Sequence, residues 1–405
     1  MNILFITPRI PYPPYRGDKL HVFNLVKRLS ARHRVGLVTF VESDAERVHI
    51  EPLSEFCSFI RVTHLSKWTS LFNCATVLFN RTPFQVAYYR SRAFADSVRE
   101  AVAAFAPDII HSHLIRTVQY TRGLGDFPRV LGLTDAVSLY LERFAEQERN
   151  PLKRALVRME LARIIQYESV AGAYDRALVC SELDRDVILS RAPDARVGLL
   201  YNGVDLDSFT PRPDIMPEPG RIIFTGNMTY FPNIDAVQWM LTEIFPAIKV
   251  RVPHATLYLV GQNPPRAMRA LASDDVIVTG FVPDISVEYQ KSAVAVSPVR
   301  FGAGTLNKVL EPIALGVPVV ATPIGFPSLG MEAGRDIEIA DDAHTFADKV
   351  AALLEDPARA RAMAAEGARK VRERFSWDAI TADLEQHYAL ALEHFRSRSV
   401  DARRH

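Results

Sequence analysis

The sequence predicts an α/β protein made of two doubly wound domains, in which helices connect the strands of a parallel sheet. Short apolar runs alternate with helical patterns over residues 1–210, and the alternation begins again at residue 221. Strands separated by helices are typical of parallel sheets, because each crossover needs a connecting segment. Between the two parts, residues 211–220 hold four prolines, which fix φ and remove backbone donors. We therefore expect a linker there.

Strands are expected where short apolar runs end at proline, glycine or a polar residue. In the first domain such runs lie at 2–8, 34–40, 108–113 and 176–181, and in the second at 221–226, 255–261, 276–282, 293–299 and 317–323. Helical patterns lie at 19–30, 143–174 and 234–250. The second domain, 221–377, is expected to end near Trp377, and residues 378–405 to form an amphipathic helix and a tail.

The composition is that of a globular protein with more than one core. The chain has 405 residues, of which 48% are hydrophobic and 23% charged. A formal net charge of +1 gives no indication of nucleic-acid binding. The cysteines, Cys57, Cys74 and Cys180, lie far apart, so neither a disulfide framework nor a metal site is expected. Without a signal peptide or a long apolar run, the sequence predicts a cytoplasmic protein, at most bound to a membrane surface.

One stretch of the first domain favours contact with such a membrane surface. Residues 61–99 hold six basic residues and one acid, Asp96, with aromatic side chains among them. Basic and aromatic residues together suit an anionic membrane interface. A helical lid whose aromatic residues pack on the first domain explains the same pattern, and the sequence leaves both alternatives open.

The strongest indication of chemistry lies at 298–322, PVRFGAGTLNKVLEPIALGVPVVAT. A strand runs into a loop containing Gly302 and Gly304, and a helix is expected over 306–315. Glycines let the backbone approach a ligand closely, and the free N–H groups of a helix N-terminus attract an anion. The passage therefore suits the binding of a phosphate group.

Two charged side chains on the same helix extend this hypothesis to a nucleotide. Lys308 and Glu311 are three residues apart and share one helix face. A cation in the first turn is disfavoured by the helix dipole unless an anion is bound nearby. Glu311, one turn deeper, is placed to accept hydrogen bonds from two ribose hydroxyls. The alternative is an exposed ion pair on a surface helix, and the neighbouring glycines favour the nucleotide.

At this passage the chain resembles glycosyltransferase family 4, whose GT-B fold has two Rossmann-like domains facing a central cleft. Glu311 stands at the second glutamate of the family's pair, and 314–321 matches its A-x-G-x-P-V-V-A run. The Gly-Ala-Gly-Thr form of the loop is similar to a subgroup associated with bacterial exopolysaccharide biosynthesis. The family's closing Phe-Ser-Trp, here at 375–377, implies a last helix that crosses back to the first domain.

The resemblance implies a retaining, metal-independent enzyme that needs no cofactor. Such an enzyme moves a hexose from a UDP- or GDP-sugar to a glycan or a lipid-linked acceptor at the inner membrane face. The leaving phosphate oxygen is then expected to take the acceptor's proton, on the face where the acceptor attacks.

The resemblance covers nearly the whole chain and implies roles for further residues. Gly17 matches a loop glycine that closes on the donor phosphate, and His113 matches the second histidine of P-D-x-x-H-x-H, near the donor sugar. Gly226 matches a strand-end glycine that approaches the donor. Phe281 and Val282 match the nucleobase position. The implied catalytic residues are His113, Lys308 and Glu311, and the donor-binding set also includes Asn227, Arg300, Gly302, Gly304, Thr305, Leu306 and Asn307.

The chain departs from the family pattern at three positions. The first glutamate of the pair falls on Ala303. The loop that opens the second domain has Asn227 and Pro232 where many members have an arginine and a lysine that grip the phosphates. Lys308 and Arg300 are then the candidates for the positive charge.

His111 and Asp135 are expected on the acceptor side of the first domain. Asp135 follows an apolar run in LGLTDAVSLY. It either lines the acceptor site or caps a helix at 136–140, and the sequence leaves both alternatives open.

Other functions compete with transfer on this kind of fold. Loss of the first glutamate and of the basic pair is consistent with a sugar-nucleotide-binding protein without turnover. A sugar-nucleotide epimerase needs acidic and histidine residues converging on the sugar, of which the sequence indicates His113. A dinucleotide dehydrogenase is disfavoured because no GxGxxG follows the strands at 2–8 or 221–226.

Overall fold

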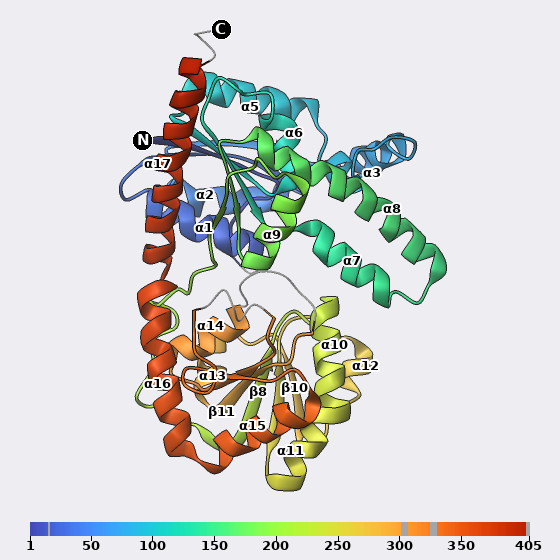
Figure 1. The fold of residues 1–405 in the computed structure, drawn as a ribbon, viewed down its shortest axis with the longest axis vertical. Coiled ribbons are helices and arrows are strands. Elements are labelled where there is room, and N and C mark those ends of the chain that lie inside the picture. Colours follow the sequence, from blue (N-terminus) through green and yellow to red (C-terminus); the bar gives the residue numbers. More distant parts are fainter. Residues whose placement is uncertain (15–16, 301–306, 325–329, 402–405) are drawn as a thin grey trace. The chain divides into compact units, whose positions relative to one another are not determined.

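Contacts within the chain divide it into two units, Met1–Tyr201 with Ile380–His405, and Asn202–Ala379. The computed structural model describes residues 1–14, 17–300, 307–324 and 330–401. Each unit holds one parallel sheet with helices on its faces (Figure 1). The predicted fold class, two doubly wound Rossmann-like domains, is confirmed. The second unit begins before the predicted linker at 211–220, and a strand starts inside that segment.

The sheet of the first unit has seven strands in the described part of the chain, in the order β3-β2-β1-β4-β5-β6-β7. The strands are β1 (Asn2–Thr7), β2 (Arg34–Val41), β3 (Phe59–His64), β4 (Ile109–His113), β5 (Arg129–Thr134), β6 (Arg176–Val179) and β7 (Val197–Leu199). The order reverses between β1 and β4, where Ile3 pairs with Ile109. Ligands bind beyond the carboxyl ends of strands at such a switch point, so the end of β4 is a candidate position for a site.

Helices connect these strands. They are α1 (Gly17–Leu29), α2 (Ile50–Ser54), α3 (Lys67–Thr76), α4 (Phe84–Tyr88), α5 (Arg92–Phe105), α6 (Val118–Thr121), α7 (Val137–Gln147), α8 (Pro151–Glu168) and α9 (Glu182–Arg191). The single helical pattern predicted along 143–174 is wrong, since α7 and α8 are separate helices. Asn150 caps α8, and its Oδ1 accepts from the backbone N–H of Leu152 at 3.0 Å. Pro151 in the first turn fits a helix start there.

The last helix, α17 (Trp377–Asp401), packs against the first unit. The Tyr388 side chain is fully buried, and its hydroxyl lies 2.8 Å from Nδ1 of His111 on β4. Glu385 accepts hydrogen bonds from Arg32 at 3.0 Å and contacts His33 at 2.7 Å. A segment more than 175 residues beyond β7 therefore completes the core of this unit.

The second sheet has six strands among the described residues, in the order β10-β9-β8-β11-β12-β13. The strands are β8 (Glu218–Thr225), β9 (Thr256–Val260), β10 (Val276–Gly280), β11 (Ser292–Ser297), β12 (Val319–Ala321) and β13 (Glu338–Ile339). The order reverses between β8 and β11, where Ile222 pairs with Val294. The loops after these two strands therefore define a second switch point.

The helices of the second unit are α10 (Phe231–Trp239), α11 (Phe245–Arg251), α12 (Arg266–Arg269), α13 (Ile285–Gln290), α14 (Asn307–Ala314), α15 (Ala343–Glu355) and α16 (Pro357–Arg374). A π-helical turn at Met240–Ile244 joins α10 to α11, where the sequence predicted one helix at 234–250. Helix α14 follows β11 and packs beside α16.

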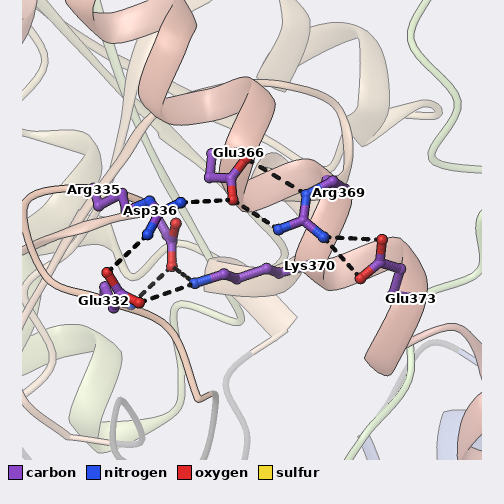
Figure 2. A network of polar contacts seen from close by, with 7 residues as sticks. All are labelled: Glu332, Arg335, Asp336, Glu366, Arg369, Lys370 and Glu373. Atoms are coloured by element: carbon purple, nitrogen blue, oxygen red, sulfur yellow. Dashed lines mark hydrogen bonds and ion pairs between the residues drawn. The ribbon is translucent and has the colours of Figure 1, made fainter.

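A network of charged residues attaches α16 to the loop before β13 (Figure 2). Lys370 contacts the buried carboxylate of Asp336, and Arg369 lies 2.7 Å from Glu366 and 3.0 Å from Glu373. Exposed pairs contribute little singly, but a network around a buried carboxylate orients its helix. Gly367 lets α16 approach closely, because a Cβ there would lie 2.7 Å from the Asp336 carbonyl oxygen. The network therefore fixes the helix against which α14 packs. Its members are Glu332, Arg335, Asp336, Glu366, Arg369, Lys370 and Glu373.

Candidate functional site

Glycines occupy the carboxyl ends of three neighbouring strands in the second sheet. Gly226 follows β8, Gly261 follows β9, and Gly280 ends β10 with φ of +77°. A Cβ on Gly261 would lie 1.7 Å from the Gly226 carbonyl oxygen, and a Cβ on Gly226 would lie 2.5 Å from Nδ2 of Asn233. Only glycine allows these loops to pass so closely. The edge of the sheet at the switch point is therefore lined by backbone.

Lys308 in α14 reaches toward this edge. Its Nζ donates to Oδ1 of Asn233, whose Nδ2 donates to the Asn227 carbonyl oxygen at 2.8 Å. Lys308 is half-buried, and Nζ lies 5.0 Å from the centre of the Phe224 ring. Burial lowers the pKa of Lys308 to about 8, and Glu311 opposes that change. In the described part of the chain Lys308 has no ion pair, so its charge is available to a bound anion.

Glu311 lies one turn further along α14. Its Oε2 accepts a hydrogen bond from the Tyr289 hydroxyl at 3.4 Å, and that hydroxyl lies 2.5 Å from Oγ1 of Thr225 at the end of β8. Burial raises the pKa of Glu311 to about 8, while hydrogen bonds from Tyr289 and Asn307 and the charge of Lys308 lower it. A carboxyl group held in this way, three residues from a lysine on the same helix, is suited to form hydrogen bonds with hydroxyls of a ligand.

The other positions considered as sources of positive charge do not supply a free cation. Arg300 is already paired, and positions 227 and 232 hold uncharged residues. Arg300 forms a two-point pair with Asp235 at 2.7 and 3.0 Å, so α10 already compensates much of its charge. Asn227 is exposed, and its Oδ1 accepts from the backbone N–H of Thr229 at 3.0 Å. Pro232 is buried in the first turn of α10. Of these candidates, Lys308 is the one whose cation has no carboxylate partner among the described residues.

The position predicted for the nucleobase follows β10. Phe281 keeps 61% of its surface exposed, and Val282 beside it is half-buried. An exposed aromatic face next to Gly280 suits stacking with a base. Five residues named from the sequence lie outside the described residues, namely Gly302, Ala303, Gly304, Thr305 and Leu306.

In the first unit, His113 ends β4 at the switch point. It is 3% exposed and its ring stacks on His21 of α1, with ring centres 5.9 Å apart. Burial, with His21 nearby, lowers the pKa of His113 to about 3, although Asp18 opposes the change. Nε2 of His113 has no hydrogen-bond partner among the described residues. The next residue, Leu114, has φ of +65°, a conformation unfavourable for a side chain with Cβ and often found at functional sites.

Asp135 follows β5, the neighbour of β4, and also comes after a strained residue. Thr134 has φ of +70°. Asp135 does not cap α7, because the N–H of Ala136 donates to Asp184 at 2.9 Å and the N–H of Ser138 donates to Glu168 at 2.9 Å. Its half-buried carboxyl has no hydrogen-bond or ion-pair partner among the described residues, and burial raises its pKa to about 7. The helix-cap alternative is therefore wrong, and the acceptor-side prediction for Asp135 stays a prediction.

Arg116, three residues after His113, adds a cation near Asp135. Its guanidinium carbon lies 5.7 Å from the centre of the Tyr89 ring, and the guanidinium carbon of Arg9 lies 5.9 Å from the same ring. Arg9 is paired with Asp18 at 2.9 Å, whereas Arg116 has no ion pair within the described residues. Burial lowers the pKa of Arg116, and Asp18 and Asp135 oppose that effect. A carboxyl and a guanidinium therefore remain without strong partners at the ends of β4 and β5.

His111 requires a correction. The sequence placed it on the acceptor side, but it is 1% exposed, stacked on Phe5 and bonded to Tyr388 of α17. Gly132 lets the ring fit, because a Cβ there would lie 2.7 Å from Nε2 of His111. His111 is thus part of the core. Gly17 is exposed at the start of α1, and a Cβ there would meet no described atom within 4 Å, so packing does not require this glycine.

Several residues of the two sites were missed from the sequence. Gly261 repeats the pattern of Gly226, an apolar run followed by glycine, and that signal was present. Asn233, Tyr289 and Arg116 gave no such signal, because their partners lie far away in the sequence. Among the described residues no group of three or more His, Cys, Asp or Glu side chains is arranged to hold a metal ion.

A half-buried lysine and glutamate beside a glycine-lined strand edge, in the second of two doubly wound units, are the arrangement that the sequence resemblance to glycosyltransferases implies. Family models agree with this class. The model "Glycosyltransferase Family 4" matches residues 16–208, and "Glycosyl transferases group 1" matches residues 219–356. Together they cover most of the chain, which therefore carries a Glycosyltransferase Family 4 domain followed by a glycosyl transferases group 1 domain.

Known relatives are similar over part or most of the chain. A GDP-mannose-dependent alpha-(1-6)-phosphatidylinositol monomannoside mannosyltransferase of Mycolicibacterium smegmatis is 30% identical over 46% of this chain and 54% of its own length. The match thus spans about half of that relative. An uncharacterized 44.6 kDa protein in the cps region of Klebsiella pneumoniae is 20% identical over 86% of this chain and 90% of its own.

Solved structures share the fold. Sucrose-phosphate synthase from Thermosynechococcus elongatus superposes with a TM-score of 0.68 and 18% identity, over 96% of this chain and 98% of its own. Anabaena HepE in complex with UDP superposes with a TM-score of 0.67 and 15% identity, over 96% and 100% of the two chains. At these identities the likeness shows the fold alone.

We expect the stability of the protein to depend on pH through His113. The unfolded chain takes up a proton near pH 6.5, whereas the folded site does so near 3. Between these values the unfolded state binds more protons, so the free energy of unfolding decreases as pH falls. Urea unfolding at a series of pH values should show a smaller decrease for His113→Gln than for the wild type. His344→Gln, at an 86% exposed side chain, is the control, and equal slopes in all three proteins would contradict the prediction.

Proposed function

We propose that this protein transfers a hexose from a UDP- or GDP-sugar to a hydroxyl group of a glycan or a lipid-linked acceptor. The observation that carries the proposal is the position of Lys308 and Glu311 on α14, beside the glycine-lined loop after β8. A diphosphate is anionic, and a ribose offers two neighbouring hydroxyls. The cation and the carboxylate match these two groups at the spacing of one helical turn.

In this proposal Lys308 stabilises the diphosphate as it leaves. Negative charge develops on the phosphate oxygen when the bond to the sugar breaks, and a fixed cation stabilises that charge best where little water is present. The hydrogen bond to Asn233 holds the Lys308 amine at the loop after β8, where Asn227 and Pro232 supply no charge. The leaving phosphate oxygen takes the proton of the attacking hydroxyl.

We propose that the acceptor binds at the ends of β4 and β5 in the first unit. Asp135 is suited to bind a hydroxyl of the acceptor, and Arg116 is suited to an anionic group such as a phosphate. Support comes from the names of relatives, since the Mycolicibacterium smegmatis enzyme uses GDP-mannose and a phosphatidylinositol mannoside. The Klebsiella pneumoniae relative in a cps region supports a role in exopolysaccharide biosynthesis, which we propose to take place at the cytoplasmic face of a membrane.

Replacement of Glu311 should abolish nucleotide recognition. At about 100 times its dissociation constant, a nucleoside diphosphate stabilises the folded wild type by roughly 2.7 kcal/mol. Thermal unfolding with UDP and with GDP should show this shift for the wild type, and Glu311→Gln and Lys308→Ala should lose most of it relative to their own ligand-free forms. Lys291→Ala, at a lysine of the same unit whose side chain is 40% exposed, is the control. A wild type that neither nucleotide stabilises would refute the proposed donor site.

Replacement of Asp135 should slow transfer to the acceptor and leave binding of the donor nucleotide unchanged. We expect Asp135→Asn to lower the rate of sugar transfer to an added acceptor by about tenfold or more, since a hydrogen bond to a charged group contributes about 1.5–3 kcal/mol. The thermal shift with the nucleoside diphosphate should remain. Asp186→Asn, at a 69% exposed carboxylate of the same unit, serves as the control. If Asp135→Asn also lost the nucleotide shift, its assignment to the acceptor would be wrong.

Retention of configuration and independence from metal ions complete the proposal. With the preferred UDP- or GDP-sugar, proton NMR of the first-formed product should show the anomeric configuration of the donor. The rate should be the same in EDTA as in Mg²⁺, because Lys308 and helix N–H groups supply the positive charge. An inverted product, or activity lost in EDTA and restored by Mg²⁺, would show that another mechanism operates.

A further inference from the structure

Helix α3 presents apolar side chains to solvent. Trp68, Leu71 and Phe72 are 83%, 57% and 68% exposed, and their spacing places them on one helix face. The polar Ser70, in contrast, is buried. A surface helix ordinarily buries its apolar face, so the amphipathic pattern of α3 is inverted. In Figure 1, α3 projects away from the first sheet, on the side where α7 and α8 also extend.

The chain that follows α3 continues this surface. Leu78 is 47% exposed and Phe79 is 100% exposed. Contiguous large apolar side chains on a surface mark contact with a partner or a membrane. We call the five residues the α3 surface, and they are Trp68, Leu71, Phe72, Leu78 and Phe79.

Bonds to α8 hold the segment in this orientation. Arg163 of α8 donates to the Leu78 carbonyl oxygen at 2.9 Å, and its guanidinium carbon lies 4.5 Å from the centre of the Phe84 ring. The Glu160 carboxylate accepts from the N–H groups of Phe84 at 2.8 Å and Gln85 at 3.2 Å. The lid alternative therefore applies to part of 61–99 only. Tyr89 packs in the core, whereas the α3 surface faces outward.

The charged residues of the segment that carries the α3 surface are positive, and the neighbouring acid Glu160 of α8 accepts hydrogen bonds from the backbone N–H groups of Phe84 and Gln85. No Asp or Glu occurs between Glu55 and Asp96. Lys67 begins α3 and Arg81 follows Phe79, and both are exposed without an ion pair in the described part of the chain. Apolar and aromatic side chains flanked by unpaired cations complement a surface that has an apolar interior and anionic groups at its boundary with water.

We propose that the α3 surface inserts into the interface of an anionic lipid bilayer. The aromatic rings enter the boundary between headgroups and acyl chains, and Lys67 and Arg81 contact lipid phosphates. A second copy of the chain is a poorer occupant, because a symmetric contact pairs the same patch of both copies, and the segment that carries this patch has cations but no acid to complement them. Helix α8 also exposes two leucines, Leu152 at 81% and Leu156 at 51%. The proposal does not depend on the transferase activity.

Trp68 provides a direct probe. The other tryptophans, Trp239 and Trp377, are 5% and 1% exposed. A change in tryptophan emission when the protein binds vesicles therefore reports on Trp68. The full chain should sediment with vesicles of phosphatidylglycerol and phosphatidylcholine, and its tryptophan emission should shift to shorter wavelength. Vesicles of phosphatidylcholine alone should bind less, and salt should weaken binding to the anionic vesicles. Absence of binding to anionic vesicles would overturn the proposal.

Matched variants distinguish insertion of the α3 surface from nonspecific binding of the protein to vesicles. Trp68→Ser with Phe72→Ser and Phe79→Ser should lower the partition coefficient by about tenfold or more, because each aromatic contributes its buried apolar area. Lys67→Glu with Arg81→Glu should remove the preference for anionic vesicles. The control, Met216→Ser with Val250→Ser, changes residues that are 74% and 83% exposed in the second unit and should bind as the wild type. Unchanged binding of the aromatic variant, or a wild-type dimer in light scattering that this variant abolishes, would refute the proposal.

Discussion

The candidate donor site depends on the close approach of two strand ends in the second unit. The carbonyl oxygen of Gly226 occupies the space that a side chain at Gly261 would need, and Asn233 occupies the space beside Gly226. Asn233 in turn binds Lys308 and positions its amine. The placement of the cation therefore rests on a backbone contact that only glycine permits. From the other side, α14 is supported by α16, which the network around Asp336 holds in place (Figure 2).

Both sites keep polar groups in arrangements that do not favour stability. Lys308 and Glu311 are half-buried on one helix face, burial shifts the pKa of each toward its neutral form, and no ion pair joins them among the described residues. In the first unit, Leu114 and Thr134 have positive φ directly beside His113 and Asp135. Each such conformation costs about 1–3 kcal/mol, so favourable contacts elsewhere in the unit must hold it in place. Leu114 and Thr134 are two of the four non-glycine residues with positive φ in the described part of the chain, and the others are Ala106 and Asn263.

The first unit combines a well-covered core with an uncovered apolar surface. Helix α17 buries Tyr388 against His111, and within the described residues each helix is too short or too polar to cross a bilayer. The α3 surface, in contrast, is held outward by Arg163 and Glu160 of α8. An acceptor carried on a lipid and an enzyme that contacts the same bilayer would meet by diffusion along the membrane surface. This connects the acceptor site proposed at β4 and β5 with the membrane contact proposed for the α3 surface.

The sequence by itself determined the features that depend on neighbouring residues. The alternation of apolar runs and helical patterns gave the two parallel sheets, and helical spacing placed Lys308 and Glu311 on one face. It failed at Asn150, where a cap and a proline divide one helical pattern into α7 and α8. Tertiary structure alone decided which candidates are exposed or paired. It buried His111 under α17, paired Arg300 with Asp235 and left Asp135 without a capping role. The physical reason is that periodicity and capping act over a few residues, whereas burial and partner choice are set by segments that packing brings together from far along the chain.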